Sequence, residues 1–428
     1  MWTHVRKDDR LSVIDRIEIT PELDTWLRET RRYIHMNPEL SLDETNTARL
    51  VSGHLKELGI KHRTGVGGDG RPYLADPKVL EAAGFQLKPT SGGTGLLATI
   101  EGRAPGKTLL IRADMDALPI DEQNDTPYRS TKAGVMHACG HDAHTTILMG
   151  VAELLNGLRD QFDGTVKLMF QPGEEGSAGA LAMIHDGILD DPPVDAALAL
   201  HVDNQIPVGS IGVASGTLMA NGDVMRVTVR GVGGHAAFPH QAVDPVVVSA
   251  HILVALQEIV SREIDPFDSA VVTFGAINSG TRNNIIPASA RLEGTVRTFK
   301  DDVQDHIERR IGEIARGVAE SMRAEADVNY LRWYPSLTND QTMTEIVREA
   351  ATERLGADRV VGLEPTFGGE DFAFVSQKVP SCMFRLGVAN AERGITYSVH
   401  HPRFDLDEDA LAVGVEVMSA AALRYLNS

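Results

Sequence analysis

Apolar residues repeat at helical spacing near the start of the chain, and this pattern predicts two helices. The first has Thr20 as its cap and begins at Pro21, since proline suits the first helical position, and it carries Leu23 and Leu27 on its apolar side. The second follows Ser41 and Glu44, which stand three residues apart as in a capping box. We therefore expect one helix from Pro21 and a second helix capped by Ser41 and Glu44.

Short apolar runs then alternate with stretches of helical periodicity. The runs most typical of strands cover residues 108–111, 166–170 and 196–200. An apolar helical face lies between the first two runs. Alternation of strands and helices predicts an α/β fold, in which helices cover a mixed sheet.

The middle of the chain has a different pattern. Two-residue alternation marks a strand at 223–230, and a long helix begins at Asp244-Pro245. Strands near 270–277 and 291–299 and a helix across 302–322 follow. This order fits an inserted α+β domain of the ferredoxin-like type. We expect the larger domain to comprise residues 1–217 and 335–428, and the inserted domain to comprise residues 218–334.

Residues 68–92 interrupt the pattern with a loop. Asp76-Pro77 predicts a short helix through Ala83, and Lys88-Pro89 ends it. The segment is either a lid over a site or a surface excursion. We favour the excursion, because surface loops tolerate insertions.

Length and charge narrow the class of protein. The chain has 428 residues, enough for two domains, and 41 basic against 60 acidic residues give a net charge of −19. Such a surface repels nucleic acid and anionic membranes, so we expect neither as a partner. No continuous apolar run approaches the roughly 20 residues that span a bilayer, and the N-terminus is too polar for a signal peptide. We therefore expect a cytoplasmic protein.

The two cysteines have different surroundings. Cys382 lies in an apolar stretch and is typical of a core residue, and two cysteines make no disulfide framework. Cys139 lies between histidines, directly before a predicted helix, where the helix dipole favours a thiolate. A thiolate and an imidazole two residues apart, as Cys139 and His141 are, can hold a divalent metal.

Further polar residues follow the predicted strands. Glu174 and Glu175 come after the strand at 166–170, where neighbouring side chains point in different directions. One could bind metal while the other acts as a general base; a solvated loop pair is the alternative. His201 follows the strand at 196–200, and His400 lies near the C-terminus. Sites in α/β sheets form at the carboxyl ends of strands, so we expect these residues to meet.

Three aspartates are candidates for a supporting role. Asp114 and Asp116 follow the strand at 108–111, and Asp142 follows His141. Each could orient a ligand histidine and fix its tautomer. Helix capping and turn formation are the alternative roles.

Six motifs, taken together and in order, carry a family resemblance. They are Asp114-Met115-Asp116-Ala117-Leu118-Pro119, His137-Ala138-Cys139-Gly140-His141-Asp142, Gln171-Pro172-Gly173-Glu174-Glu175, Gly233-Gly234-His235-Ala236-Ala237, Asn284-Ile285-Ile286-Pro287 and Gly369-Glu370-Asp371-Phe372. The chain resembles the amidohydrolase branch of the aminoacylase/carboxypeptidase metallopeptidase family from about Arg31 to its C-terminus.

The resemblance implies a catalytic domain with an inserted lid or dimerisation domain, and a homodimer. It implies Glu174 as the general base, His235 as a donor to the substrate carbonyl in the partner's site, and Asn284 as a substrate contact. The metal ligands that it implies are Cys139, His141, Glu175, His201 and His400. These ligands allow one or two divalent ions, with Zn²⁺ or Mn²⁺ expected and Ni²⁺ or Co²⁺ also compatible.

Two arginines depart from the family pattern. Arg282 precedes the Asn284 motif, and Arg385 interrupts an apolar strand. A guanidinium matches a carboxylate bidentately, so we expect one of them to bind a carboxylate-bearing small-molecule substrate.

The reaction that we expect is hydrolysis of the C–N bond of an N-acyl or N-aroyl amino acid. A second hypothesis keeps the same residues and removes an amino group hydrolytically from an aromatic carboxylate. A third, a binding protein without catalysis, predicts the loss of Glu174 or of a ligand, and every one of those positions is filled.

Overall fold

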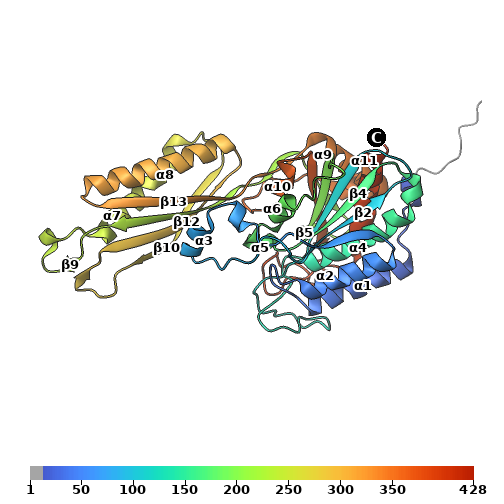
Figure 1. Cartoon of the computed structure of the whole chain (residues 1–428), viewed down its shortest axis with the longest axis horizontal. Helices are drawn as coiled ribbons and strands as arrows, with labels where there is room; N and C mark the ends of the chain where they lie inside the picture. The colour runs from blue at the N-terminus through green and yellow to red at the C-terminus, as the bar shows by residue number, and fades with distance from the viewer. Residues whose placement is uncertain (1–12) are drawn as a thin grey trace, which may run out of the picture. The chain divides into compact units, whose positions relative to one another are not determined.

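The computed structural model describes residues 13–428, so the polar N-terminal segment lies outside the described residues. The chain forms two compact units (Figure 1). The larger unit comprises the chain up to Gly216, together with Thr338–Glu364 and Phe374–Ser428. The smaller unit comprises Thr217–Leu337 and the short segment Pro365–Ala373, which the sequence had grouped with the last part of the larger domain.

An eight-stranded mixed sheet forms the centre of the larger unit. Its outer pairs β1/β2 and β2/β4 are antiparallel, and its central neighbours β4/β3, β3/β5 and β5/β16 are parallel. In sheet order the strands are β1 (Lys61–Val66), β2 (Gly95–Glu101), β4 (Thr165–Gln171), β3 (Thr108–Asp114), β5 (Ala196–Pro207), β16 (Ser381–Ala389), β6 (Ile211–Gly212) and β15 (Val360–Val361).

Helices cover this sheet, which confirms the predicted α/β fold. The long helices α4 and α11 contact each other and the central strands, and α1 contacts both of them. N-terminal and C-terminal elements therefore share one core (Figure 1). The helices of the larger unit are α1 (Pro21–Met36), α2 (Thr45–Glu57), α3 (Pro77–Ala82), α4 (His141–Gly157), α5 (Glu174–Ser177), α6 (Gly179–His185), α9 (Gln341–Leu355), α10 (Ala373–Ser376) and α11 (Asp409–Leu426).

The central strands are buried on both faces, as near-continuous apolar runs require. Every residue of β3 is buried. Strand β5 continues to Pro207, well beyond the predicted end at residue 200. His201 therefore lies within the strand and not after it, because β16 continues to pair with β5 past this point.

The predicted cap of α1 is confirmed, and the predicted cap of α2 is wrong. The Thr20 hydroxyl accepts a hydrogen bond from the Leu23 N–H, and Pro21 opens α1. At α2, neither Ser41 nor Glu44 caps the helix, and the Glu39 carboxylate accepts from the Asn46 and Thr47 N–H groups instead. Ser41 instead donates to Asp116, and Glu44 accepts from the Gly173 N–H. Ser41 and Glu44 bind groups in the loops that follow β3 and β4, so neither side chain is available to cap α2.

The smaller unit is an antiparallel sheet with helices on one face, as predicted. The sheet order is β10 (Ala270–Ser279), β12 (Ser289–Thr298), β8 (Gly222–Arg230) and β13 (Glu325–Tyr334). Buried and exposed positions alternate along β8. The buried side chains pack against α7 (Pro245–Glu258) and α8 (Asp301–Ser321). The order along the chain is β-α-β-β-α-β, the ferredoxin-like order.

Helix α7 differs from an ordinary core helix because much of it is exposed. Together with the short π-helical turn Ile259–Glu263, it is long and apolar enough to cross a membrane by length and composition alone. Only 33% of this stretch is buried. Polar residues interrupt the stretch, which is why the sequence showed no continuous apolar run there. Val246, Val247 and Val254 are exposed on α7, with 73% of Val254 accessible.

Candidate metal centre

A tight turn in front of α4 brings Cys139 and His141 together. Gly140 has φ +82°, in the left-handed region that favours glycine. A Cβ at this position would lie 2.4 Å from Val202 Cγ2, so a larger residue does not fit. The turn leaves Cys139 just outside the helix and His141 as its first residue.

All five predicted ligands belong to the larger unit and gather in one cluster. Cys139 Sγ lies 3.4 Å from His201 Nε2, and His400 Nε2 lies 3.1 Å from Glu175 Oε1. Three groups each have ligand atoms within 4.8 Å of one another: Cys139, His141 and His201; Cys139, Glu175 and His400; and His141, Glu174 and Glu175. These groups share members, so the six residues form a single site.

The hydrogen bonds of the His201 and His141 rings leave one nitrogen of each ring available to a metal ion. His201 donates from Nδ1 to the Val202 carbonyl at 2.8 Å, which leaves Nε2 without a proton and facing Cys139. His141 Nδ1 lies 3.2 Å from Asp116 Oδ1. Within the described residues, His141 Nε2 is buried without a hydrogen-bond partner. Thiolate, imidazole and carboxylate together suit a divalent transition metal, so the donor set fits the implied ion.

The site is buried at one end and open at the other. Cys139, His141 and His201 are buried, Glu175 is half-buried, and His400 is exposed. His400 has φ +66°, unusual for a residue with a side chain, and its N–H donates to the Ala138 carbonyl at 2.7 Å. This bond ties the C-terminal ligand to the segment that carries Cys139.

The local electrostatics differ among the ligands. Burial raises the pKa of the Cys139 thiol despite nearby His141 and His400. Burial and the positive charge of Arg385 hold the pKa of His201 well below its usual range, which favours a neutral imidazole. Hydrogen bonds to Cys139 and Glu175 raise the pKa of His400 to about 10.

Asp116 holds the glutamate loop, which is the segment Glu174–Ala178 and includes the irregular turn α5. It accepts hydrogen bonds from the backbone N–H groups of Glu174 and Glu175, at 3.1 and 3.0 Å. It also accepts from Ser41 Oγ at 2.6 Å and lies beside His141 Nδ1. One carboxylate therefore links a ligand histidine to the glutamate loop.

Asp114 binds a histidine that the sequence interpretation missed. Its Oδ1 lies 2.6 Å from His144 Nδ1, and the Val202 N–H donates to His144 Nε2 at 3.0 Å. Both ring nitrogens of His144 are thus engaged, so it supports the site and does not bind metal. Burial alone would raise the pKa of Asp114, but Arg112 and His141 outweigh it and hold the pKa well below its usual range. The helical i, i+3 spacing from His141 was the available signal for His144.

Asp142 does not orient a ligand histidine, and that prediction is wrong. It faces inward from the first turn of α4 and lies 2.8 Å from both Arg31 Nε and His35 Nδ1. His35 Nε2 lies 3.3 Å from Glu122, and Arg31 also pairs with Asp405 at 3.0 Å. Burial would raise the pKa of Asp142, but Arg31 and His35 hold it far below its usual range. This buried ionic cluster is a support that the sequence interpretation missed.

Arg385 lies beside the ligand cluster. In the parallel pairing of β16 with β5, Arg385 stands opposite His201, so both side chains leave the same face of the sheet. Its side chain is half-buried, and its charge acts on His201. The positive charge is therefore close to the ligand cluster.

The remaining candidates belong to the smaller unit and are exposed. His235 lies on β9 (Gly234–His235), which pairs with β11 (Ile285–Ile286). The Ala236 N–H donates to the Asn284 carbonyl at 3.1 Å, so His235 and Asn284 are neighbours. Arg282 is part of the same turn before β11.

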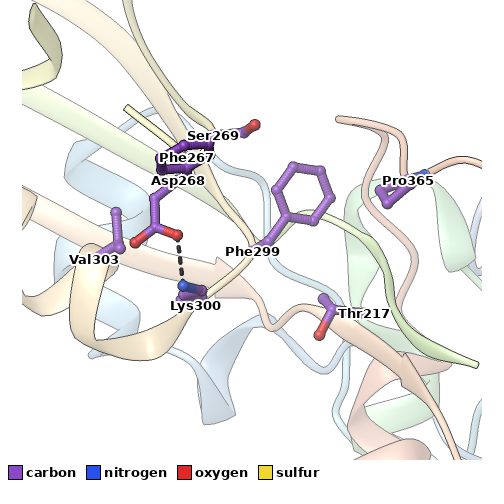
Figure 2. Close-up of a pocket in the computed structure, with 8 residues that line it drawn as sticks. All are labelled: Thr217, Phe267, Asp268, Ser269, Phe299, Lys300, Val303 and Pro365. Atoms are coloured by element: carbon purple, nitrogen blue, oxygen red, sulfur yellow. Dashed lines mark hydrogen bonds and ion pairs between the residues drawn. The ribbon is translucent and has the colours of Figure 1, made fainter. Parts of the chain in front are cut away.

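A cavity in the smaller unit is separate from these candidates. It measures about 180 Å³ and contains an ion pair between Lys300 and Asp268 (Figure 2). Its lining comprises Thr217, Phe267, Asp268, Ser269, Phe299, Lys300, Val303 and Pro365. None of the predicted site residues lines it.

Comparisons with known proteins give a consistent result. The model of peptidase family M20/M25/M40 matches residues 110–424. N-acetyl-L-cysteine deacetylase of Bacillus subtilis is 37% identical, over 95% of this chain and 89% of that protein. IAA-amino acid hydrolase ILR1-like 4 of Arabidopsis thaliana is 34% identical, over 94% and 86%. The crystal structure of the Bacillus subtilis YXEP protein, a dinuclear metal-binding peptidase of the M20 family, has a TM-score of 0.78 and 35% identity and covers 95% of this chain and 99% of that one.

Proposed function

Because the chain belongs to peptidase family M20/M25/M40 and is therefore a metal-binding hydrolase of amide bonds, we propose that it cleaves the C–N bond of an N-acyl or N-aroyl amino acid. The observation that carries this proposal is the single cluster of Cys139, His141, Glu175, His201 and His400 beside Glu174. Two relatives with deacetylase and amino acid hydrolase names support the substrate class.

The five ligands would hold one or two divalent ions. A bound ion lowers the pKa of water towards neutrality and polarises the carbonyl under attack. Zn²⁺ and Mn²⁺ suit the mixed donor set, and Ni²⁺ or Co²⁺ would also fit. The dinuclear site named for the YXEP protein favours two ions.

Glu174 is our candidate for the general base. It is buried, and Asp116 holds its backbone N–H, so its position is fixed. Its neighbour Glu175 lies 3.1 Å from His400 Nε2, so the two adjacent glutamates would have different roles, Glu175 as a ligand and Glu174 as the base. Glu174 would take a proton from the attacking water and return it to the leaving nitrogen. The return is needed because an amine anion is a poor leaving group.

His235 and Asn284 would complete the site in a homodimer. His235 is exposed on a short strand pair, where its ring could donate to a substrate oxygen as negative charge develops. The exposed valines of α7 and the edge strand β10, where 56% of Ile277 is accessible, support a dimer through the smaller unit.

Arg385 is our preferred group for the substrate carboxylate. Its position opposite His201 places a guanidinium near the ligand cluster. Arg282 is the second candidate, on the same turn as Asn284. Replacing the correct arginine with methionine should raise KM about 10–100-fold, since it removes a charge-assisted contact.

The test is product analysis with metal-loaded protein. Aroyl-amino acids and amino-substituted aromatic acids are supplied in parallel, and the Glu174→Ala variant is the control. Release of a free amino acid by the wild type alone supports the proposal. Release of ammonia alone would overturn it in favour of hydrolytic deamination. Binding without turnover of either class would favour a protein without catalysis.

A further inference from the structure

The segment 68–92 belongs to the larger unit, and its two ends meet at a narrow neck. The Gly93 N–H donates to the Gly67 carbonyl at 2.8 Å, and the Asp69 N–H donates to the Pro89 carbonyl at 3.0 Å. A Cβ at Gly93 would lie 2.4 Å from the Gly67 oxygen. The two chain segments at the base, near Gly67 and Gly93, therefore approach as closely as glycine allows. The segment is therefore anchored at its base.

A buried carboxylate organises the segment internally. Asp69 is fully buried and accepts from Arg71 Nε at 2.8 Å and Arg71 Nη2 at 2.6 Å. It also accepts from the backbone N–H groups of Arg71 and Lys88, at 3.1 and 2.9 Å. Leu80 of α3 is fully buried. A buried charge persists only when it is paired in this way, so the segment has a defined structure.

One side of the segment contacts the loop that carries Glu174 and Glu175. The Gly70 N–H donates to the Ser177 carbonyl at 2.9 Å. A Cβ at Gly70 would lie 1.9 Å from the Ala178 oxygen, so the two backbones touch. Tyr73 stacks on His185, at the end of α6, with ring centroids 3.7 Å apart.

The loop itself needs support. Gly173, Gly176 and Ala178 all have left-handed φ, at +60°, +79° and +52°. For Ala178, which has a side chain, this conformation costs about 1–2 kcal/mol. Such strain persists only where the surroundings fix the backbone.

The other side of the segment contacts the loop through Ser41. Lys88 Nζ donates to the Ser41 carbonyl at 3.3 Å and pairs with Asp43 at 2.7 Å. Ser41 Oγ donates to Asp116, which holds the N–H groups of the glutamate loop. The segment thus contacts the glutamate loop directly through Gly70 and indirectly through Lys88, Ser41 and Asp116.

We propose that segment 68–92 is a positioning clamp for the loop Glu174–Ala178. The clamp holds Gly70 against Ala178 and Lys88 against Ser41, and it thereby fixes Glu175 as a metal ligand. Its effect on Glu174 rests on the proposed function, whereas its effect on metal binding does not. A passive surface excursion would have neither effect.

The decisive variant is Gly70→Ala. Gly70 has an ordinary φ of −83°, so the added methyl group acts only through its contact with Ala178. The matched control is Gly53→Ala, in α2, where nothing lies within 4 Å of the added Cβ. Three quantities are measured: Zn²⁺ affinity by titration calorimetry, hydrogen exchange of residues 172–186, and kcat and KM.

For Gly70→Ala we expect roughly 10–100-fold weaker Zn²⁺ binding, the usual effect of losing support for a ligand. Exchange in 172–186 should accelerate, and kcat should fall about 10²-fold with KM nearly constant, as for a misplaced catalytic group. Zn²⁺ affinity, exchange and kcat within about twofold of the Gly53→Ala control would overturn the clamp. If the wild type hydrolyses no amide, Zn²⁺ affinity and exchange still decide the question.

A second variant tests the clamp if Gly70→Ala does not fold. Lys88→Ala removes a partly exposed side chain, and Lys78→Ala on α3 is its control. We expect Lys88→Ala to weaken Zn²⁺ binding by about 5-fold, in proportion to one partly exposed ion pair, and Lys88→Arg to restore it. Equal Zn²⁺ affinity in Lys88→Ala and Lys78→Ala would remove Lys88 from the clamp.

Discussion

The ligand cluster of the larger unit and the His235 strand pair of the smaller unit are built in opposite ways. Around the buried part of the cluster, charged side chains hold the backbone or one another, as Asp116 holds the glutamate loop and Arg31 pairs with Asp142. His235 and Asn284 are exposed on two-residue strands. Under the proposed function, most groups that bind metal are positioned before substrate arrives, and His235 and Asn284, which would act in a dimer, are accessible.

We expect the largest effect from a substitution of Glu174, beside the ligand cluster of the larger unit. Glu174→Ala removes the proposed base and leaves the five predicted metal ligands in place, so kcat should fall on the order of 10³-fold. Metal content, measured by elemental analysis, should stay at the wild-type value. Loss of the metal together with the activity would show that Glu174 is a ligand and not the base.

The ionic cluster behind the site should matter for stability. Asp142→Asn removes the fully buried carboxylate beside Arg31 and His35 while Arg31 stays paired with Asp405, so the free energy of unfolding should fall by about 3 kcal/mol. Asp24→Asn, which breaks the partly exposed pair with Arg28, is the control and should cost under about 1 kcal/mol. Chemical denaturation measures both. Equal losses would mean that burial of the cluster is not what distinguishes the larger unit.

In the smaller unit, we expect substitution of the exposed His235 to affect catalysis and not stability. His235→Ala should lower kcat about 10²-fold, the usual effect of removing one donor to a developing oxyanion. Its melting temperature should match that of the wild type, because the ring is exposed. His240→Ala, exposed in the same unit, is the control. Unchanged kcat in His235→Ala would remove the smaller unit from the chemistry.

The smallest effect concerns pH. Burial, with a contribution from Asp116, raises the pKa of Glu44 from 4.5 to about 7. The folded state therefore holds a proton that the unfolded state releases, so stability should fall as pH rises from about 4.5 to 7. In metal-depleted protein, the Glu44→Gln change should flatten this slope by roughly 2 kcal/mol between pH 5 and 7, measured by denaturation. An identical slope in both proteins would contradict the assignment.

Local patterns predicted most of the fold correctly. The α1 cap, the short helix after Asp76 and the order of elements in the smaller unit depend on neighbours in sequence, and all three are confirmed. The membership of the family, carried by six motifs, is confirmed as well. The six residues of the metal cluster come together as expected for strand ends, and their individual roles stay predictions.

The errors share one physical cause. Ser41 and Glu44 form a capping pattern in sequence, but distant groups at Asp116 and Gly173 compete for the same oxygens and win. Asp142 pairs with Arg31 and His35, from a helix more than a hundred positions earlier. Spacing along the chain contains no information about such partners, because their proximity arises only from packing.

The bond between Arg31 and Asp405 joins residues 374 positions apart. Asp405 also follows the last predicted ligand, His400, so the predicted site and its support draw on residues from Arg31 to Asp405. During synthesis, the metal-binding geometry cannot form before the ribosome has released the C-terminal part of the chain. Contacts this distant also slow folding, since the loop must close before the pairing stabilises it. A copy that ends before His400 therefore lacks one of the five predicted ligands, so the complete predicted site depends on the segment after β16.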